Sequence, residues 1–143
     1  MKEQWIMTLH NVQCEDGEKT EVTLNTEISY EKNSNGGRII TYRESEATGM
    51  EGSVTQVQIS PDNMITVIRA GNFSMHLVVQ MGRKHFCNYE TPYGNTIFGI
   101  SAKFIYNTLT DEGGILKFRY MIDTNSSLVS DNEISIEIKK HAC

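Results

Sequence analysis

The feature that most constrains this chain is a strict alternation of apolar and polar side chains, repeated in one short segment after another. Side chains two positions apart share one face of a β-strand. Nine turn signals rich in Gly, Asn, Asp and Pro separate ten such segments. The apolar rows include Val22, Leu24, Ile28 and Tyr30; Phe73, Met75, Leu77, Val79 and Met81; Phe98, Ile100, Ala102, Phe104 and Tyr106; Leu116, Phe118, Tyr120 and Ile122; and Ile134, Ile136 and Ile138.

One apolar and one polar face per strand is the pattern of an antiparallel sheet. An open sheet of ten strands would leave two edges and one bare apolar face, and closure into a barrel removes both problems. We therefore predict an all-β fold, an antiparallel up-and-down β-barrel of about ten strands, in a single domain spanning residues 1–143. A β-sandwich is the alternative that the same turn spacing allows.

Composition agrees with this fold and narrows the function. The chain has 15 Ile but 6 Leu, and 13 Thr but 4 Ala, a bias toward β-formers. No apolar run is long enough for a membrane span or a signal peptide, and three scattered cysteines suggest neither a disulfide framework nor a zinc knuckle. The net charge of −5 argues against nucleic acid as a partner. We expect a reduced, cytoplasmic protein.

Several motifs in serial order resemble the bacterial YwiB-like family of unknown function. They are Thr41–Glu46, Thr48–Gly52, Ile68–Gly71, Tyr89–Gly94 and Phe118–Tyr120. The resemblance extends from about Leu9 to Ile138 and implies a calycin-type, lipocalin-like barrel, but it brings no activity with it. Lipocalins typically begin with Gly-x-Trp. Trp5 lies in the first expected strand here, whereas Glu3 replaces the glycine. In such barrels a late Arg often stacks on this Trp, a role open to Arg119.

Three arginines are candidates for a ligand site inside the barrel. Arg43, Arg69 and Arg119 each follow alternating residues on their own strand face. An interior Arg, together with Tyr89 or Tyr120, could hold the carboxylate or phosphate of an amphipathic ligand. Tyr42 could contribute in the same way, and Glu44, Glu46 and Glu51 are nearby partners for an interior charge. The alternative interpretation places these arginines in salt bridges at the barrel mouth or on the solvated outer face.

Catalytic and metal sites receive less support. Glu44 and Glu46 share a strand face, but no nucleophile or metal motif accompanies them. His85 and Cys87 could be two metal ligands, fewer than zinc requires. We therefore predict no enzyme, no metal and no cofactor. Clustering of Glu44, Arg69 and Tyr89 in one cleft would favour an enzyme instead.

The leading hypothesis is a binding protein for a small apolar or amphipathic molecule, with Arg43, Arg69, Tyr89, Arg119 and Tyr120 as ligand-binding residues. The second hypothesis is an interaction module without a ligand. It would act through homodimerisation or partner docking, on an exposed sheet edge or on an outer apolar patch around Ile39, Ile40 and Tyr42.

Overall fold

The computed structural model describes residues 4–45, 50–72, 74–92, 94–124 and 127–140, without the side chains of residues 89–91. Ten strands alternate in direction along the chain. They are β1 (Trp5–Glu15), β2 (Glu18–Lys32), β3 (Arg38–Arg43), β4 (Val54–Ile59), β5 (Ile65–Ala70), β6 (Ser74–Val79), β7 (Lys84–Thr91), β8 (Gly94–Asn107), β9 (Gly114–Thr124) and β10 (Ser127–Lys140).

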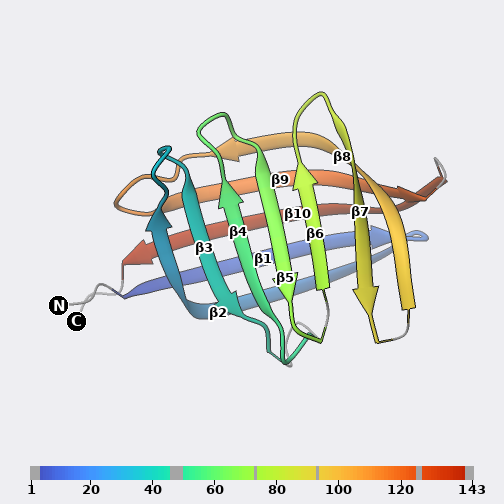
Figure 1. The fold of residues 1–143 in the computed structure, drawn as a ribbon, viewed down its shortest axis with the longest axis horizontal. Helices are drawn as coiled ribbons and strands as arrows, with labels where there is room; N and C mark the ends of the chain where they lie inside the picture. The colour runs from blue at the N-terminus through green and yellow to red at the C-terminus, as the bar shows by residue number, and fades with distance from the viewer. Residues whose placement is uncertain (1–3, 46–49, 73, 93, 125–126, 141–143) are drawn as a thin grey trace.

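Each strand pairs antiparallel with the next along the chain, and β10 returns to pair with β1. The first and last strands meet with Trp5 opposite Lys140. In Figure 1 the short strands β3 to β7 cross steeply in front of the longer β8, β9, β10 and β1. The predicted all-β, ten-stranded, antiparallel up-and-down barrel is confirmed.

The inward rows are those that alternation predicts. Leu116, Phe118 and Tyr120 are buried on β9, and Ile136 and Ile138 are buried on β10. The core cluster also contains side chains from each of the eight remaining strands. Among them, Met7, Ile40 and Ile65 have no exposed surface. Burying one face of a closed sheet supplies the main driving force for this fold.

Strand β8 departs from its predicted row because of a β-bulge. Ala102 pairs with Tyr120, but Phe104 pairs with Arg119, so Lys103 is an extra residue on β8. The extra residue reverses the alternation from that point. Ile105 therefore packs against the core in place of Phe104, and Tyr106 is exposed. The prediction that Phe104 and Tyr106 line the interior was wrong.

Strand β6 follows its predicted row only within the strand. Leu77 and Val79 are buried and Met75 packs against the core. Met81 lies in the turn that follows and is exposed, contrary to the expected row, and Phe73 lies outside the described residues. The row ends where the pleat ends, because a turn no longer holds side chains in strict alternation.

Candidate functional site

A cavity of about 470 Å³ occupies the middle of the barrel. This volume lies within the roughly 300–1,000 Å³ of small-molecule sites. Its two ends differ in polarity. One part has apolar walls formed by Leu9, Val57, Val67, Leu77, Ile100, Phe118 and Ile136. The other part contains the polar side chains of the lining, interspersed with apolar ones such as Val22, Met75, Ile122 and Ile134. The polar side chains are Asn11, Gln13, Tyr42, Glu44, Arg69, Tyr120, Ser130 and Asn132. This part reaches the rim of the barrel at Glu15, which is exposed.

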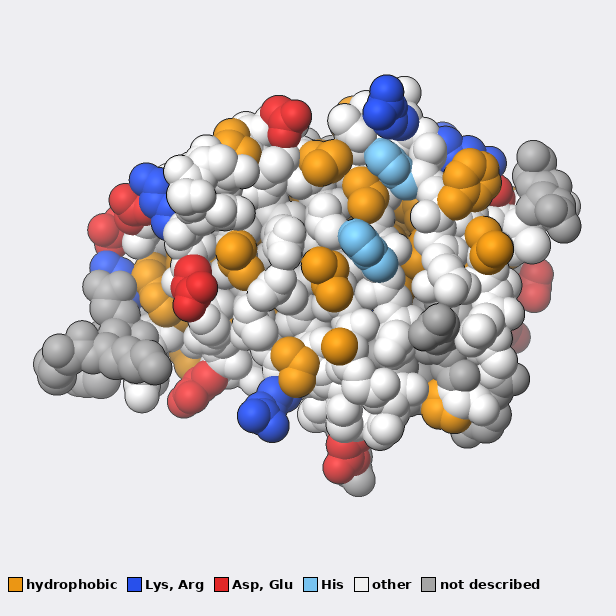
Figure 2. Space-filling model, viewed as in Figure 1, with side chains coloured by type: hydrophobic (Ala, Val, Ile, Leu, Met, Phe, Trp, Pro, Cys, Tyr) orange, Lys and Arg blue, Asp and Glu red, His pale blue; other side chains and the backbone are white. Residues whose placement is uncertain are grey.

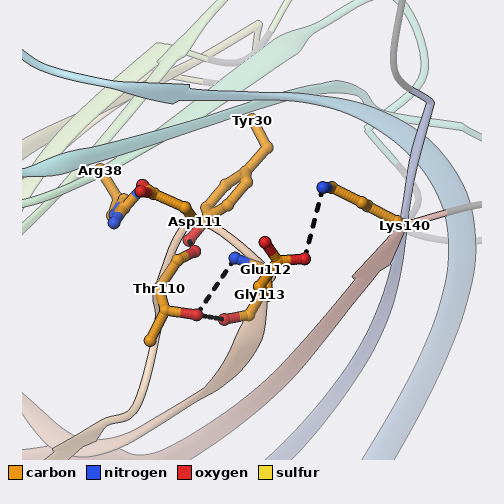
Figure 3. Close-up of polar contacts among 7 residues, drawn as sticks. All are labelled: Tyr30, Arg38, Thr110, Asp111, Glu112, Gly113 and Lys140. Carbon is orange, nitrogen blue, oxygen red and sulfur yellow. Dashed lines mark hydrogen bonds and ion pairs between the residues drawn. The ribbon is translucent and has the colours of Figure 1, made fainter.

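The opposite end of the barrel is closed by the loop between β8 and β9 (Figure 3). The Tyr30 hydroxyl donates to the Thr110 carbonyl oxygen at 2.8 Å, and Arg38 Nη1 lies 2.7 Å from Asp111 Oδ1. These contacts join β2 and β3 to a loop from the opposite wall of the barrel. Lys140 bonds to Glu112 in the same loop at 3.3 Å. The cavity therefore has one closed, apolar end, and its polar side chains lie toward the rim.

The most unusual group in the polar half is a buried ion pair. Glu44 directly follows β3 and continues the inner row of Ile40 and Tyr42, while Arg69 on β5 continues the inner row of Val67. Glu44 Oε2 lies 3.4 Å from Arg69 Nε, with side-chain exposures of 1% and 10%. A charged pair this deeply buried costs desolvation free energy, which the attraction between the two charges offsets only when they remain together.

Thr55 on β4 lies between the two charged groups. Its Oγ1 donates to Glu44 Oε2 at 2.6 Å and accepts from Arg69 Nε at 3.1 Å. The register explains this meeting, because Tyr42, Thr55 and Arg69 are Cα partners across β3, β4 and β5. Side chains opposite one another on adjacent strands are close enough to interact directly. Glu44 lies two residues after Tyr42 on the same inner row, so this register brings Glu44, Thr55 and Arg69 together.

Two buried oxygen atoms in this half have no hydrogen-bond partner among the described residues. They are Glu44 Oε1 and Asn11 Oδ1. Both residues line the cavity. Buried polar atoms in native proteins are nearly always paired with protein groups or water, so these two oxygens can accept hydrogen bonds from a molecule in the lumen.

Two tyrosines complete the polar half. Burial raises the pKa of Tyr120 to about 12, and burial together with the nearby Glu44 carboxylate raises the pKa of Tyr42 well above its usual value. Both phenols are therefore neutral hydrogen-bonding groups at physiological pH. Burial also raises the pKa of the Cys87 thiol, which lines the same cavity. The polar half can therefore bind a ligand through neutral hydroxyls and one charged pair.

Comparison with known proteins agrees with this architecture. A family model described as a domain of unknown function (DUF1934) matches residues 7–136. The chain belongs to this family. A crystal structure of the ywiB protein from Bacillus subtilis superposes with a TM-score of 0.84 at 18% sequence identity, covering 98% of this chain and 93% of that one. No curated protein matches the chain. The similarity to the YwiB-like family that the motifs indicated is thus confirmed.

The structure brings together two of the five predicted ligand-binding residues. Arg69 and Tyr120 both line the cavity of this family member. Arg43 is exposed at the end of β3, on the face opposite Tyr42. Arg119 also lies outside, because its neighbours Phe118 and Tyr120 point inward. The Tyr89 side chain lies outside the described residues.

The outward position of Arg119 also excludes its expected stacking on Trp5. Its Nε donates to Asp131 at 2.9 Å across the β9–β10 pair. The cation over the Trp5 ring is instead Lys140, whose Nζ lies 5.5 Å from the ring centroid. The Tyr30 ring packs edge-on against the same indole, with 4.8 Å between the two ring centroids. The aromatic closure of this barrel end exists, but its cation comes from β10.

The candidate catalytic and metal-binding residues do not form one cluster among the described residues. Glu44 and Arg69 meet, as the enzymatic hypothesis required of these two, whereas Glu51 is exposed in a turn and Glu46 lies outside the described residues. His85 Nε2 hydrogen-bonds Gln80 Oε1 at 2.9 Å. Within the described part of the chain, no group of three His, Cys, Asp or Glu side chains could hold a metal ion.

The outer apolar patch expected around Ile39, Ile40 and Tyr42 does not exist. Ile40 and Tyr42 belong to the core, and only Ile39 points outward, because alternation separates neighbours. Figure 2 shows apolar side chains dispersed singly over the face formed by β3 to β7. No helix in the described ranges is long and apolar enough to cross a membrane. Homodimerisation stays a prediction without the surface that motivated it.

Sequence reasoning missed Thr55, Asn11 and Asn132 as site residues. Each continues an inner row: Thr55 with Val57 and Ile59, Asn11 with Met7 and Leu9. A polar residue in an otherwise apolar row was the available signal. It identifies a residue that faces the interior, and it therefore distinguishes lumen polar groups from those of the outer face.

Proposed function

We propose that this protein binds a small amphipathic molecule inside the barrel. The observation that carries the proposal is the cavity of about 470 Å³, with apolar walls toward the closed end and polar groups toward the rim. Such a division suits a ligand with an apolar body and a polar head. An apolar body would bind by leaving water for the walls formed by Val57, Leu77 and Phe118.

The polar half supports the orientation of the ligand. Arg69 and Glu44 are held by Thr55 before any ligand enters, so little side-chain entropy is lost on binding. The closed end, bound by Tyr30 and Arg38 to the β8–β9 loop, supports entry from the opposite rim. The head would then remain near the rim while the apolar body enters first.

The first test is native mass spectrometry of the protein purified from cells. A co-purifying ligand adds mass to the 16.2 kDa chain and is released by denaturation. The second test is titration with Nile red, a neutral lipophilic dye, whose fluorescence rises in apolar surroundings. Absence of both added mass and dye binding would contradict the proposal.

A cavity-filling variant localises the dye. Val57 and Val67 are Cα partners on β4 and β5, and both line the apolar half. We expect Val57→Phe/Val67→Phe to weaken dye binding at least about tenfold by occupying the lumen. The control Val54→Phe/Ile115→Phe introduces the same number of phenylalanines at two exposed positions and should leave dye binding unchanged. Equal effects of both variants would place the dye outside the barrel.

A further inference from the structure

We infer that the ligand head bound near Arg69 is an uncharged group with a hydrogen-bond donor and an acceptor side by side, as in a primary carboxamide. The inference rests on the proposed function and narrows its ligand class. It also revises the carboxylate or phosphate head that an isolated interior arginine would favour. The deciding feature is the Glu44 carboxylate, 3.4 Å from Arg69 Nε.

The Glu44 carboxylate balances the charge of Arg69 before a ligand arrives. The two side chains are 1% and 10% exposed, so solvent screens the charges weakly. An anionic head beside Arg69 would also lie beside Glu44, and its repulsion by the carboxylate would cancel much of its attraction to the guanidinium. A cationic head would meet the reverse problem. An uncharged head avoids the repulsion in both cases.

The hydrogen-bonding positions that the pair leaves unused specify which donors and acceptors the ligand head must carry. Glu44 Oε2 is engaged by Thr55, whereas Glu44 Oε1 is buried and unpartnered among the described residues, so it can accept from a donor on the head. The contacts of Arg69 with Glu44 and Thr55 both run through Nε. Within the described ranges no acceptor bonds its two terminal nitrogens, which can therefore donate to the head.

A carboxamide matches both requirements with one planar group. Its N–H donates to Glu44 Oε1, and its carbonyl oxygen accepts from an Arg69 terminal nitrogen. A carboxylate has no hydrogen to offer Glu44 Oε1, and it would leave this oxygen unsatisfied.

The test compares three eight-carbon ligands that differ only at the head: octanamide, octanoate and octylammonium. Each displaces Nile red from the wild-type protein at pH 7.5. We expect octanamide to bind at least about tenfold more tightly than either ion, because an ion adds an uncompensated charge to a balanced, buried pair. Octanoate binding as tightly as octanamide would overturn the inference while leaving the proposed function intact. Failure of Nile red and all three ligands to bind would overturn the proposed function itself.

Two variants should reverse the preference in opposite directions. Glu44→Gln leaves Arg69 unbalanced, so octanoate should become the tightest ligand. Arg69→Met leaves Glu44 unbalanced, so octylammonium should become the tightest. The control Asp131→Asn removes the carboxylate from the outer-face pair with Arg119 and should leave the order unchanged. Trp5, the single tryptophan, reports by its fluorescence whether each variant is folded. An unchanged order in either folded lumen variant would also overturn the inference.

Discussion

Removing both partners of the buried Glu44–Arg69 pair should destabilise the barrel far less than the sum of the two single removals. With 3.4 Å between Arg69 Nε and Glu44 Oε2, Coulomb attraction at an effective dielectric constant of about 20 amounts to about 5 kcal/mol. Most of this attraction offsets the desolvation of the two charges, so the intact pair contributes little net stability. The single variant Arg69→Met retains the desolvation cost of Glu44 and loses the attraction.

We expect Arg69→Met to lower the free energy of unfolding by about 3 kcal/mol, near the lower end for a broken buried pair. The lower end applies because Thr55 still donates to Glu44 and the lumen reaches the rim. Glu44→Gln should cost about 2 kcal/mol, since its amide can still accept from Thr55. The double variant should cost about 2 kcal/mol or less, which gives a coupling free energy of about 3 kcal/mol.

The assay is urea unfolding at pH 7, monitored by the fluorescence of the buried Trp5. The control is Arg119→Met. That variant breaks the outer-face pair with Asp131, in which the arginine side chain is 42% exposed, and should lower the free energy of unfolding far less than Arg69→Met does. If Arg69→Met costs no more than Arg119→Met, or if the two lumen variants add independently, the ion pair is solvated and the reasoning about its burial fails.

Three further predictions concern pH, the closed end and a turn. Because the pKa of buried Tyr120 is raised to about 12 from 10.0, its neutral form stabilises the fold below pH 10, and the stability is lost as pH rises from about 10 to 12. Tyr120→Phe should make this part of a pH–stability profile less steep, while Tyr42, whose pKa is also raised, supplies a remaining slope. An unchanged profile would exclude Tyr120 as a source of the pH dependence. Tyr30→Phe removes the hydroxyl bonded to Thr110 and should cost about 1 kcal/mol in urea unfolding, whereas the exposed Tyr106→Phe should cost nothing measurable. Gly71→Ala should lower the melting temperature markedly, because the residue has φ +128° and a Cβ there would collide with the Gly52 carbonyl oxygen. Gly17 has φ +78° and open space around it, so Gly17→Ala should lower the stability by only about 1 kcal/mol. If both variants lowered the melting temperature equally, the collision expected at Gly71 would be contradicted.

Alternation along the sequence predicts the barrel well because a pleated strand must place successive side chains on opposite faces. Leu116, Phe118 and Tyr120 were assigned inward on this basis, and all three are buried. The same rule failed for Phe104, because the extra residue Lys103 on β8 shifts the pairing with β9. A bulge depends on the partner strand, so one strand's own pattern does not reveal it.

Arg69 faces the barrel interior as predicted, whereas Arg43 and Arg119 face outward, for a related reason. Arg69 continues the apolar row of Ile65 and Val67, whereas Arg119 alternates with Phe118 and Tyr120, a stronger apolar row than its own. Weighing both rows of a strand would have placed Arg119 outside. The meeting of Glu44 with Arg69 depends on the registers of β3, β4 and β5 together, and periodicity carries no information on register.

The pairing of β1 with β10 has a consequence for how this chain folds during synthesis. Trp5 finds its neighbour Lys140 only after all ten strands have left the ribosome, so β1 has an unpaired edge until then. The final closing step joins strands separated by more than a hundred residues, which favours slow folding. While the edge is open, the apolar row that includes Met7 and Leu9 is exposed to other nascent chains. Truncations that remove β10 should therefore aggregate rather than fold into a smaller barrel.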